Sequence, residues 1–309
     1  RYSPDQMELD ARDVVARAIA KEITEGRGTE NGGVYLDISH REREFIETRL
    51  PRMYERFMEL GVDMAEEAVE VAPTAHYGMG GVRTDDVGET DVDGLYAVGE
   101  TMAGVHGANR LGGNSLAETI AYGAVTSEAV ADRLADDEPT TSDRDDDGVD
   151  EAIRVHLRDL AALSAADGEH DPEALLVELR TLLWERTGIL RDEAGLADGL
   201  ERLATLRERA ADLAVTGVTS RSYEFALNLG FALRTAEAIL RSARKRTESR
   251  GAHYRTDYPE TDPEWQRNVL VRADSVGTMQ LSTSTVGTPS EAVQAALDGE
   301  YELDYHQLE

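Results

Sequence analysis

Hydrophobic residues recur at intervals of three and four positions in three long stretches of the second half of the chain. These stretches span 171–188, 195–213 and 222–249, and leucine supplies most of the apolar positions in the first two. Such spacing gathers the apolar side chains on one stripe of an α-helix. Three helices with one stripe each can bury those stripes against one another. The pattern therefore predicts an antiparallel three-helix bundle whose leucines form a core rather than a cofactor site.

The first seventy residues mix helical and strand-like patterns. Residues 11–25 have the apolar spacing of a helix, and 33–38 alternate apolar and polar positions like a half-buried strand. Ser39 and Glu42 have the spacing of a capping box, which predicts that a second helix begins there. Pro51 is expected to interrupt that helix, because proline lacks the amide hydrogen that a helix interior uses.

The next part of the chain predicts two short strands and a long helix. Residues 68–75 and 94–99 are short apolar runs of the kind found in buried strands. The helix is expected over 114–136, where Ser115 and Glu118 again have capping-box spacing. Its apolar face is expected to contain Leu116, Ile120, Val125 and Val130.

An acid-rich segment with almost no apolar residues follows this helix. Residues 136–151 have the composition of a solvated linker, and residues 256–309 that of a loop-rich tail with one or two strands. The sequence therefore predicts a multidomain α+β chain. Its parts are expected at 1–70, 71–135, 136–151, 152–255 and 256–309.

Charge and composition limit the partners and the kinds of site. The 309 residues include 62 Asp and Glu against 32 Lys and Arg, a formal net charge of -30. This excess repels phosphates, so no nucleic-acid partner is expected. Acids spread over the whole chain are typical of proteins kept soluble in concentrated salt, which favours a halophilic source over an ordinary acidic protein. Without cysteine the chain holds no disulfide, thiolate zinc site or cysteine-ligated iron–sulfur cluster, and no apolar run approaches the roughly 18 residues of a membrane span.

Four places carry side chains suited to chemistry. The stretch HYGMGG sets His76 among glycines, which let a backbone approach a ligand closely. Glu100 follows the apolar run GLYAVG, where a strand would lead into a loop. Arg110 lies in VHGANRLGGNSL, and Arg12 lies in the first predicted helix. A lone histidine or arginine at such places is more often a surface group, so these motifs gain weight only in combination.

VHGANRLGGNSL, at 105–116, has the properties of an anion-binding surface. Its small residues leave room for a flat partner, and the guanidinium of Arg110 offers planar donors that match a carboxylate. The predicted helix begins directly afterwards. The amide groups and positive dipole of its first turn stabilise an anion by on the order of 1 kcal/mol. These features predict a site for a flat or anionic ligand.

The order of the motifs resembles the flavoprotein subunit of succinate dehydrogenase and fumarate reductase. HYGMGG, GLYAVGE and HGANRLGGNSL are followed by ESRGAHYRTDYP at 248–259, and RDVVAR at 12–17 and EGRG at 25–28 match as well. L-aspartate oxidase is a relative that shares a His-Gly-Ala-Asn-Arg segment. NRLGGNSL and ESRGAHYR are more similar to the succinate and fumarate enzymes.

The resemblance implies a role for each motif residue. Arg12 would exchange a proton with the substrate carbon, while His76 and Arg110 would hold the dicarboxylate. FAD would be the cofactor, taking a hydride from succinate at its N5 atom or giving one to fumarate. The residues that would bind FAD are Glu100, Asn114, Ser115 and Leu116.

The resemblance also implies domains and partners. Residues 1–70 would be the later part of a capping domain, 71–135 the closing portion of an FAD-binding α/β domain, and 152–255 the helical domain. Electrons would pass to an iron–sulfur subunit, then through membrane anchor subunits to quinone, at the cytoplasmic side of the cell membrane. The family's strand followed by G-x-G-x-x-G is not found in these residues. This chain alone is therefore expected to bind FAD poorly and to be inactive.

Two other interpretations stay open. An L-aspartate oxidase would apply the same flavin chemistry to a different substrate. A non-catalytic helical interaction fragment would keep the glycine-rich motifs only as relics. The basic stretch 241–255 stands out in an acidic chain and could dock another protein of the same complex.

Overall fold

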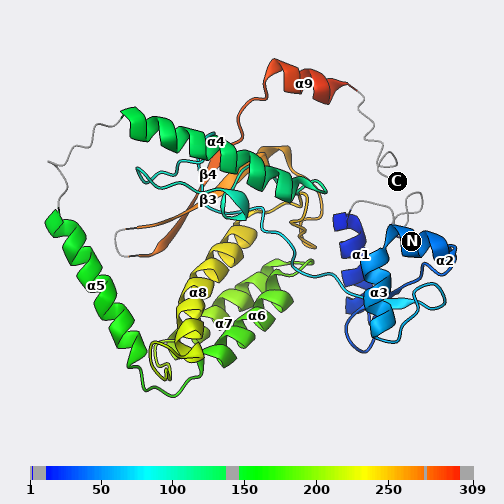
Figure 1. Cartoon of the computed structure of the whole chain (residues 1–309), viewed down its shortest axis with the longest axis horizontal. Coiled ribbons are helices and arrows are strands. Elements are labelled where there is room, and N and C mark those ends of the chain that lie inside the picture. The colour runs from blue at the N-terminus through cyan, green and yellow to red at the C-terminus, as the bar shows by residue number, and fades with distance from the viewer. Residues whose placement is uncertain (1, 3–11, 137–145, 275–276, 300–309) are drawn as a thin grey trace.

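The structure is a computed structural model that describes residue 2 and residues 12–136, 146–274 and 277–299. Helices dominate it, and two small antiparallel sheets accompany them (Figure 1). Figure 1 shows three distinct groups: the N-terminal helices, a three-helix bundle, and the long helix α4 (Asn114–Asp136). This arrangement confirms the predicted α+β, multidomain class.

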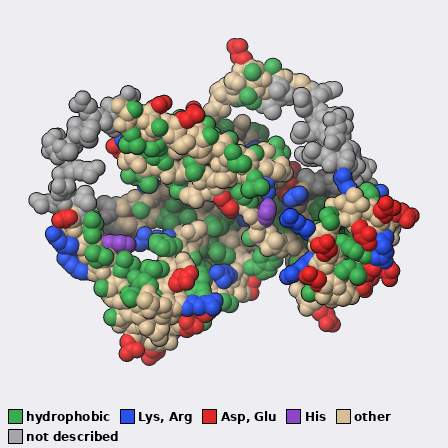
Figure 2. All heavy atoms as spheres, in the orientation of Figure 1, with side chains coloured by type: hydrophobic (Ala, Val, Ile, Leu, Met, Phe, Trp, Pro, Cys, Tyr) green, Lys and Arg blue, Asp and Glu red, His purple; other side chains and the backbone are tan. Residues whose placement is uncertain are grey.

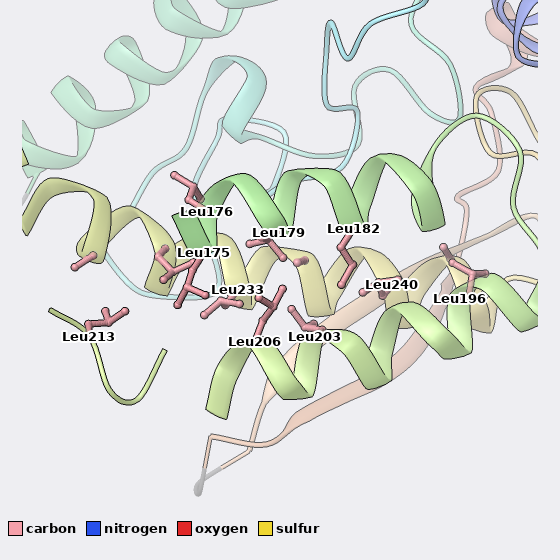
Figure 3. Close-up of a cluster of buried hydrophobic side chains, with 14 residues drawn as sticks. Leu175, Leu176, Leu179, Leu182, Leu196, Leu203, Leu206, Leu213, Leu233 and Leu240 are labelled. Carbon is pink, nitrogen blue, oxygen red and sulfur yellow. The ribbon is translucent and has the colours of Figure 1, made fainter. Parts of the chain in front are cut away.

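Three helices form the bundle that the leucine pattern predicts. Helices α6 (Pro172–Thr187), α7 (Glu193–Arg209) and α8 (Arg221–Lys245) each pack on the other two. A side chain accepts amide hydrogen bonds at the start of each helix. These caps are Asp171, Asp192 and Ser220. Figure 3 shows the buried leucines turned into the space between the three helices: Leu175, Leu179, Leu182, Leu196, Leu203, Leu206 and Leu240.

The N-terminal helices pack with a two-stranded sheet. The helices are α1 (Arg12–Thr24), α2 (Arg43–Arg49) and α3 (Pro51–Glu59). Strand β1 (Val34–Leu36) pairs antiparallel with β2 (Val69–Val71). The small core of this group consists of Ile46, Met64 and Val69, with partly buried apolar side chains around them.

The start of α2 differs from the prediction. The helix begins at Arg43, and the side chain of its N-cap residue, Glu42, makes no capping bond. The hydroxyl of Ser39 instead donates to Asp37 at 2.7 Å. The predicted capping box of Ser39 and Glu42 is therefore wrong, because a nearby aspartate competes for the serine. Pro51 does separate α2 from α3, since it occupies the first turn of α3, where its missing amide hydrogen costs nothing.

Residues 94–99 form no strand in this described part of the chain. Gly94 and Gly99 have positive φ angles of 74° and 69°, so the backbone turns at both ends of the run. A short 3-10 helix, η2 (Gly99–Thr101), follows directly. The strand predicted for 94–99 is wrong, whereas the strand predicted within 68–75 is present as β2.

Helix α4 (Asn114–Asp136) begins one residue before the predicted cap. Ser115 is already helical, and its carbonyl accepts a bond from the hydroxyl of Thr119. The carboxylate of Glu118 accepts a hydrogen bond from the hydroxyl of Tyr77 at 3.1 Å. The predicted capping box of Ser115 and Glu118 is therefore wrong, because the carboxylate of Glu118 is hydrogen-bonded to Tyr77, which is far away in sequence.

The two faces of α4 are the reverse of a usual amphipathic helix. Leu116 and Ile120, from the predicted apolar face, are 75% and 74% exposed. The side that packs on the rest of the chain carries the buried Glu118 and Thr126 instead. Figure 2 shows hydrophobic side chains on the surface over α4. Of the predicted apolar stripe, Leu116, Ile120 and Val125 face solvent, whereas Val130 is half-buried.

The remaining elements lie after residue 145. Helix α5 (Asp146–Ser164) begins inside the segment interpreted as a linker. Strands β3 (Arg267–Ala273) and β4 (Met279–Thr285) form an antiparallel hairpin, and α9 (Glu291–Asp298) follows. The domain boundaries stay a prediction. Among the helices of the described ranges, none is long and apolar enough to cross a bilayer.

Truncation of Leu229 tests the bundle core. The Leu229→Ala change removes a side chain that is 1% exposed. It should lower the free energy of unfolding by about 2–5 kcal/mol, since the lost contacts leave a cavity. Phe231 lies two residues along α8 and is 67% exposed, so Phe231→Ala should cost less than about 1 kcal/mol. Urea unfolding followed by circular dichroism measures both values, and equal losses would contradict the buried position of Leu229.

Candidate functional site

A buried polar cluster joins the loop of the HYGMGG motif to helix α4. The hydroxyl of Tyr77 donates to Oε2 of Glu118 at 3.1 Å, and Nε2 of His106 lies 3.3 Å from the same hydroxyl. The side chains of His106 and Glu118 are only 7% and 4% exposed. Partial burial, together with the bond to Glu118, raises the pKa of Tyr77 above its usual range. The tyrosine therefore stays a neutral donor that holds three segments together.

Arg110 rests on the same tyrosine. Its guanidinium lies over the ring of Tyr77, 5.0 Å from the ring centre, and its Nη1 donates to the carbonyl of Leu111 at 2.9 Å. Its Nε is buried and has no hydrogen-bond partner among the described residues. Stacking on an aromatic ring limits the positions of a guanidinium while leaving donors free. Arg110 is thus fixed in place with donor capacity to spare.

Glu100 connects the loop after Tyr77 to the turn η2. Its Oε1 accepts a hydrogen bond from the backbone amide of Gly78 at 2.8 Å. Close by, the backbone of Gly81 lies so near the carbonyl of Thr101 that a Cβ atom at this position would come within 2.2 Å of the oxygen. A larger residue would separate the two segments. Both features keep the HYGMGG loop beside Glu100.

Arg12 is the first residue of α1 and is exposed. It has no hydrogen-bond or ion-pair partner in the described ranges. The next residue, Asp13, accepts a hydrogen bond at Oδ1 from Nδ2 of Asn109 at 3.2 Å. Asn109 in turn precedes Arg110. The helix that carries Arg12 therefore touches the loop that carries Arg110.

His76 is exposed and adjacent to Tyr77. The three residues expected to handle substrate thus come from three separate segments. Each is next in sequence to a residue that contacts another of these segments. The structure brings the segments together, and the roles of the three side chains remain a prediction.

The loop before α4 leaves an open surface beside this cluster. Gly104, Gly107 and Gly113 have positive φ angles of 108°, 56° and 80°. A Cβ atom at any of them would meet nothing within 4 Å. Asn114 and Leu116 are exposed at the start of the helix, and Ser115 is half-buried. A flat ligand can therefore approach the backbone and the positive end of the helix dipole together.

Comparison with known sequences shows the same order of parts. The family described as "FAD binding domain" matches residues 1–116, and the family described as "Fumarate reductase flavoprotein C-term" matches residues 177–296. This chain belongs to the fumarate reductase and succinate dehydrogenase flavoprotein family. One relative, a fumarate reductase (CoM/CoB) of Methanothermobacter marburgensis, is 45% identical over 88% of this chain and 48% of its own length. L-aspartate oxidase of Yersinia pestis is 36% identical over 85% of this chain and 46% of its own length.

Solved structures of the flavoprotein family share the fold. Escherichia coli quinol fumarate reductase matches with a TM-score of 0.83 and 34% identity, over 92% of this chain and 50% of that chain. A quinol-fumarate reductase with menaquinol molecules matches with a TM-score of 0.84 and 33% identity, over 93% of this chain and 51% of that chain. Adenylylsulfate reductase of Archaeoglobus fulgidus, at 21% identity and a TM-score of 0.65, shares the fold alone. The chain spans about half the length of the relatives it matches.

FAD is the cofactor of this family, and the residues at the start of α4 fit it. The open glycine surface suits a flat ring. The amides of the first turn of α4 suit its electron-rich edge. The buried Oε1 of Glu118 also has no partner within the described chain, which shows that polar capacity in this cluster exceeds what these residues use.

The sequence patterns do not predict the residues that link the segments of the site, which are Tyr77, Asp13 and Glu118. Tyr77 and Asp13 each stand beside a motif residue, but nothing in their local sequence marks a distant partner. The spacing of Glu118 wrongly indicates a capping residue. A usable signal for it is its place one turn into a helix whose first turn is otherwise uncharged.

The ESRGAHYR segment, 248–255, is anchored in the helical domain. Arg255 is fully buried and donates to the backbone carbonyls of Ala243, Arg244 and Arg246 at the end of α8. Its guanidinium also makes a two-bond contact with Asp257, at 2.7 Å for each bond. That contact lowers the pKa of Asp257 to about 2. The segment therefore has a rigid base.

His253 lies in the same segment, is half-buried, and has a buried Nε2 atom. Its Nδ1 is 2.9 Å from Nη1 of Arg191, so the ring accepts a hydrogen bond from the guanidinium. Burial lowers the pKa of His253 to about 4, and the positive charge of Arg191 adds to this effect. The histidine is therefore neutral near pH 7.

The depressed pKa of His253 predicts a pH-dependent stability. Between about pH 6.5 and pH 4 the unfolded chain binds a proton at this histidine and the folded chain does not. The free energy of unfolding should therefore fall as the pH drops through this window. In His253→Gln the side-chain oxygen can still accept from Arg191 but does not titrate, so the variant should lose stability less steeply. Urea unfolding of both proteins from pH 7 to pH 4 measures the difference, and parallel curves would contradict it.

Proposed function

We propose that the complete protein is a flavin-dependent oxidoreductase that interconverts succinate and fumarate. The observation that carries this proposal is the convergence of the segments bearing Arg12, His76 and Arg110 on one place. The guanidinium of Arg110 and the imidazole of His76 match the two carboxylates of such a substrate, and Arg12 adds a group for proton transfer. The similarity to proteins named fumarate reductase supports the same assignment.

Each side chain then has a distinct task. Arg110, held on the ring of Tyr77, binds one carboxylate through its free donors. His76 contributes to holding the dicarboxylate from the neighbouring loop. Arg12, exposed at the start of α1, exchanges a proton with the substrate carbon. Two fixed carboxylates leave the substrate in one orientation relative to the proton donor.

FAD, when bound, accepts or supplies the hydride. Ser115 and Leu116 would supply backbone groups at the ring, with Asn114 beside them at the start of α4. The positive end of the α4 dipole stabilises negative charge there by on the order of 1 kcal/mol. Glu100, whose Oε1 already accepts a hydrogen bond from the amide of Gly78, would also accept hydrogen bonds from hydroxyl groups of the cofactor.

The electrons are proposed to pass through an iron–sulfur subunit, then through membrane anchor subunits, to quinone. The protein would then sit at the cytoplasmic side of the cell membrane as a peripheral subunit. The support is the fold shared with quinol fumarate reductases. The net charge of -30 makes direct attraction to an anionic lipid surface unfavourable, so partner subunits would provide the attachment.

A second candidate is L-aspartate oxidation, because relatives with that name match at 36% identity. A substrate panel separates the two. The complete FAD-containing protein should turn over succinate with an artificial electron acceptor and fumarate with a reduced donor, and should leave L-aspartate unreacted. Oxidation of L-aspartate without any succinate or fumarate turnover would replace the first proposal by the second.

Arg12→Ala tests the proton transfer. Without the guanidinium, turnover in either direction should fall by on the order of 100-fold or more, in line with the loss of a general acid. Flavin absorbance per protein should stay unchanged, because Arg12 is not among the proposed cofactor ligands. Arg56→Ala, which removes an exposed arginine of α3, is the control and should behave like the unaltered protein. Retention of turnover in Arg12→Ala would disprove this role.

A further inference from the structure

We infer that residues 250–254 of the helical domain hold α1 against the 105–110 loop, with Arg17 as the positioning residue that sets Arg12 relative to Arg110. This inference rests on the proposed function, which gives Arg12 and Arg110 their roles. The contacts that carry it are long-range, and they join three segments that are far apart in sequence.

The first contact joins residues 250–254 to the loop that carries Arg110. The amide of Ala252 donates to the carbonyl of Ala108 at 3.0 Å. Gly251 has a φ of 56°, and a Cβ atom at this position would lie 2.4 Å from the same carbonyl oxygen. Only glycine therefore allows the two backbones to come so close.

The second contact joins residues 250–254 to α1. Nη1 of Arg17 donates to the carbonyl of Gly251 at 3.3 Å, and its guanidinium lies over the ring of Tyr254, 5.3 Å from the ring centre. The same nitrogen donates to Oδ2 of Asp13 at 2.7 Å, one turn earlier in the helix. A planar guanidinium can stack and pair at once, which a lysine ammonium cannot do in this geometry.

The third contact joins α1 to the loop that carries Arg110. The other oxygen of Asp13, Oδ1, accepts the hydrogen bond from Asn109. Arg17 and Asp13 are partly shielded, with 25% and 18% of their side chains exposed. Partial burial makes such a pair stronger than a fully solvated one. The start of α1, the 105–110 loop and residues 250–254 thus hold one another by polar contacts in a closed triangle.

The corner formed by residues 250–254 is the stiff one. The amides of Arg250 and His253 each donate to the other's carbonyl, at 2.8 and 3.1 Å, which makes a tight turn. The carbonyl of Tyr254 accepts from the amide of Arg191, in the connection between α6 and α7. The fully buried Arg255 follows immediately. This corner is therefore fixed to the helical bundle, and it positions the other two.

The consequence for the site follows from sequence adjacency. Arg12 precedes Asp13, and Arg110 follows Asn109, so the Asp13–Asn109 hydrogen bond joins the sequence neighbours of the two arginines. Arg17 fixes Asp13 without lying next to either of them. Loss of Arg17 should let the start of α1 move away from the 105–110 loop. A displacement of about 1 Å between reacting groups can cost on the order of 100-fold in rate.

Arg17→Ala in the complete FAD-containing protein is the first test. With fumarate or succinate, kcat/KM should fall by on the order of 10- to 100-fold, with a higher KM for the dicarboxylate and unchanged flavin content. A variant that had merely lost folded protein would lose activity at constant KM. Arg17→Lys can still pair with Asp13 and should recover part of the loss. Arg154 makes a comparable i,i+4 pair with Asp150 on the exposed α5, so Arg154→Ala is the matched control and should show no change.

Gly251→Ala tests the opposite side of the same contact. Its methyl group would force residues 250–254 away from Ala108, so it should reproduce the rise in KM seen for Arg17→Ala. Gly61→Ala is the matched control. Gly61 also has a positive φ, 80°, but a Cβ atom there would meet nothing within 4 Å. The control therefore carries the backbone strain without the displacement.

Hydrogen exchange measured without substrate separates this inference from the proposed function. In Arg17→Ala the amides of residues 12–24 and 105–110 should exchange faster than in the unaltered protein, while those of α6 to α8 should not change. This readout holds whatever substrate the protein uses. Unchanged exchange together with an unchanged KM would overturn the positioning role. Absence of succinate and fumarate turnover in the unaltered protein would overturn the proposed function alone.

Discussion

The hydrogen bond from Tyr77 to Glu118 is the interaction on which the site depends. On the side of Tyr77 the chain has almost no regular secondary structure, since residues 72–98 contain only isolated bridges and turns, whereas Glu118 lies in α4. The bond fixes one end of the HYGMGG loop to α4, and the ring of the same tyrosine supports Arg110. A buried carboxylate is costly to leave unpaired, so its demand for a donor specifies where the tyrosine must lie. A polar requirement, rather than apolar packing, thus defines the position of the loop.

The helical domain stabilises the molecule by two different means. Its interior is a leucine core in which each side chain fills space between α6, α7 and α8. The end of the bundle at residues 246–255 is instead held by ion pairs and by hydrogen bonds from charged side chains. Arg255 satisfies the carbonyls that terminate α8, and Glu248 is fully buried between Arg246 and Arg250. Charged groups of this kind need fixed geometry to offset their desolvation, so they make the end of the bundle rigid where rigidity matters for the site.

The sequence predicted features that repeat locally and missed those that depend on distant partners. The bundle follows from leucine spacing alone, because each stripe must be buried somewhere. Both capping boxes failed for a common reason: the spacing of Ser39 and Glu42, or Ser115 and Glu118, is necessary for a cap but does not reveal competing partners such as Asp37 and Tyr77. The motif residues Arg12, His76 and Arg110 could be selected from sequence. Their neighbours Asp13 and Asn109 could not, since a single bond across the fold leaves no periodic trace.

The inverted faces of α4 have a consequence for the chain in solution. Its buried side carries Glu118 and Thr126, whereas Leu116, Ile120 and Leu134 are more than two-thirds exposed. At low ionic strength the net charge of -30 keeps copies of the chain apart. Salt screens that repulsion but leaves the attraction between apolar surfaces intact. In this chain, which spans about half the length of its relatives, added salt therefore favours contact between copies through the exposed apolar side of α4.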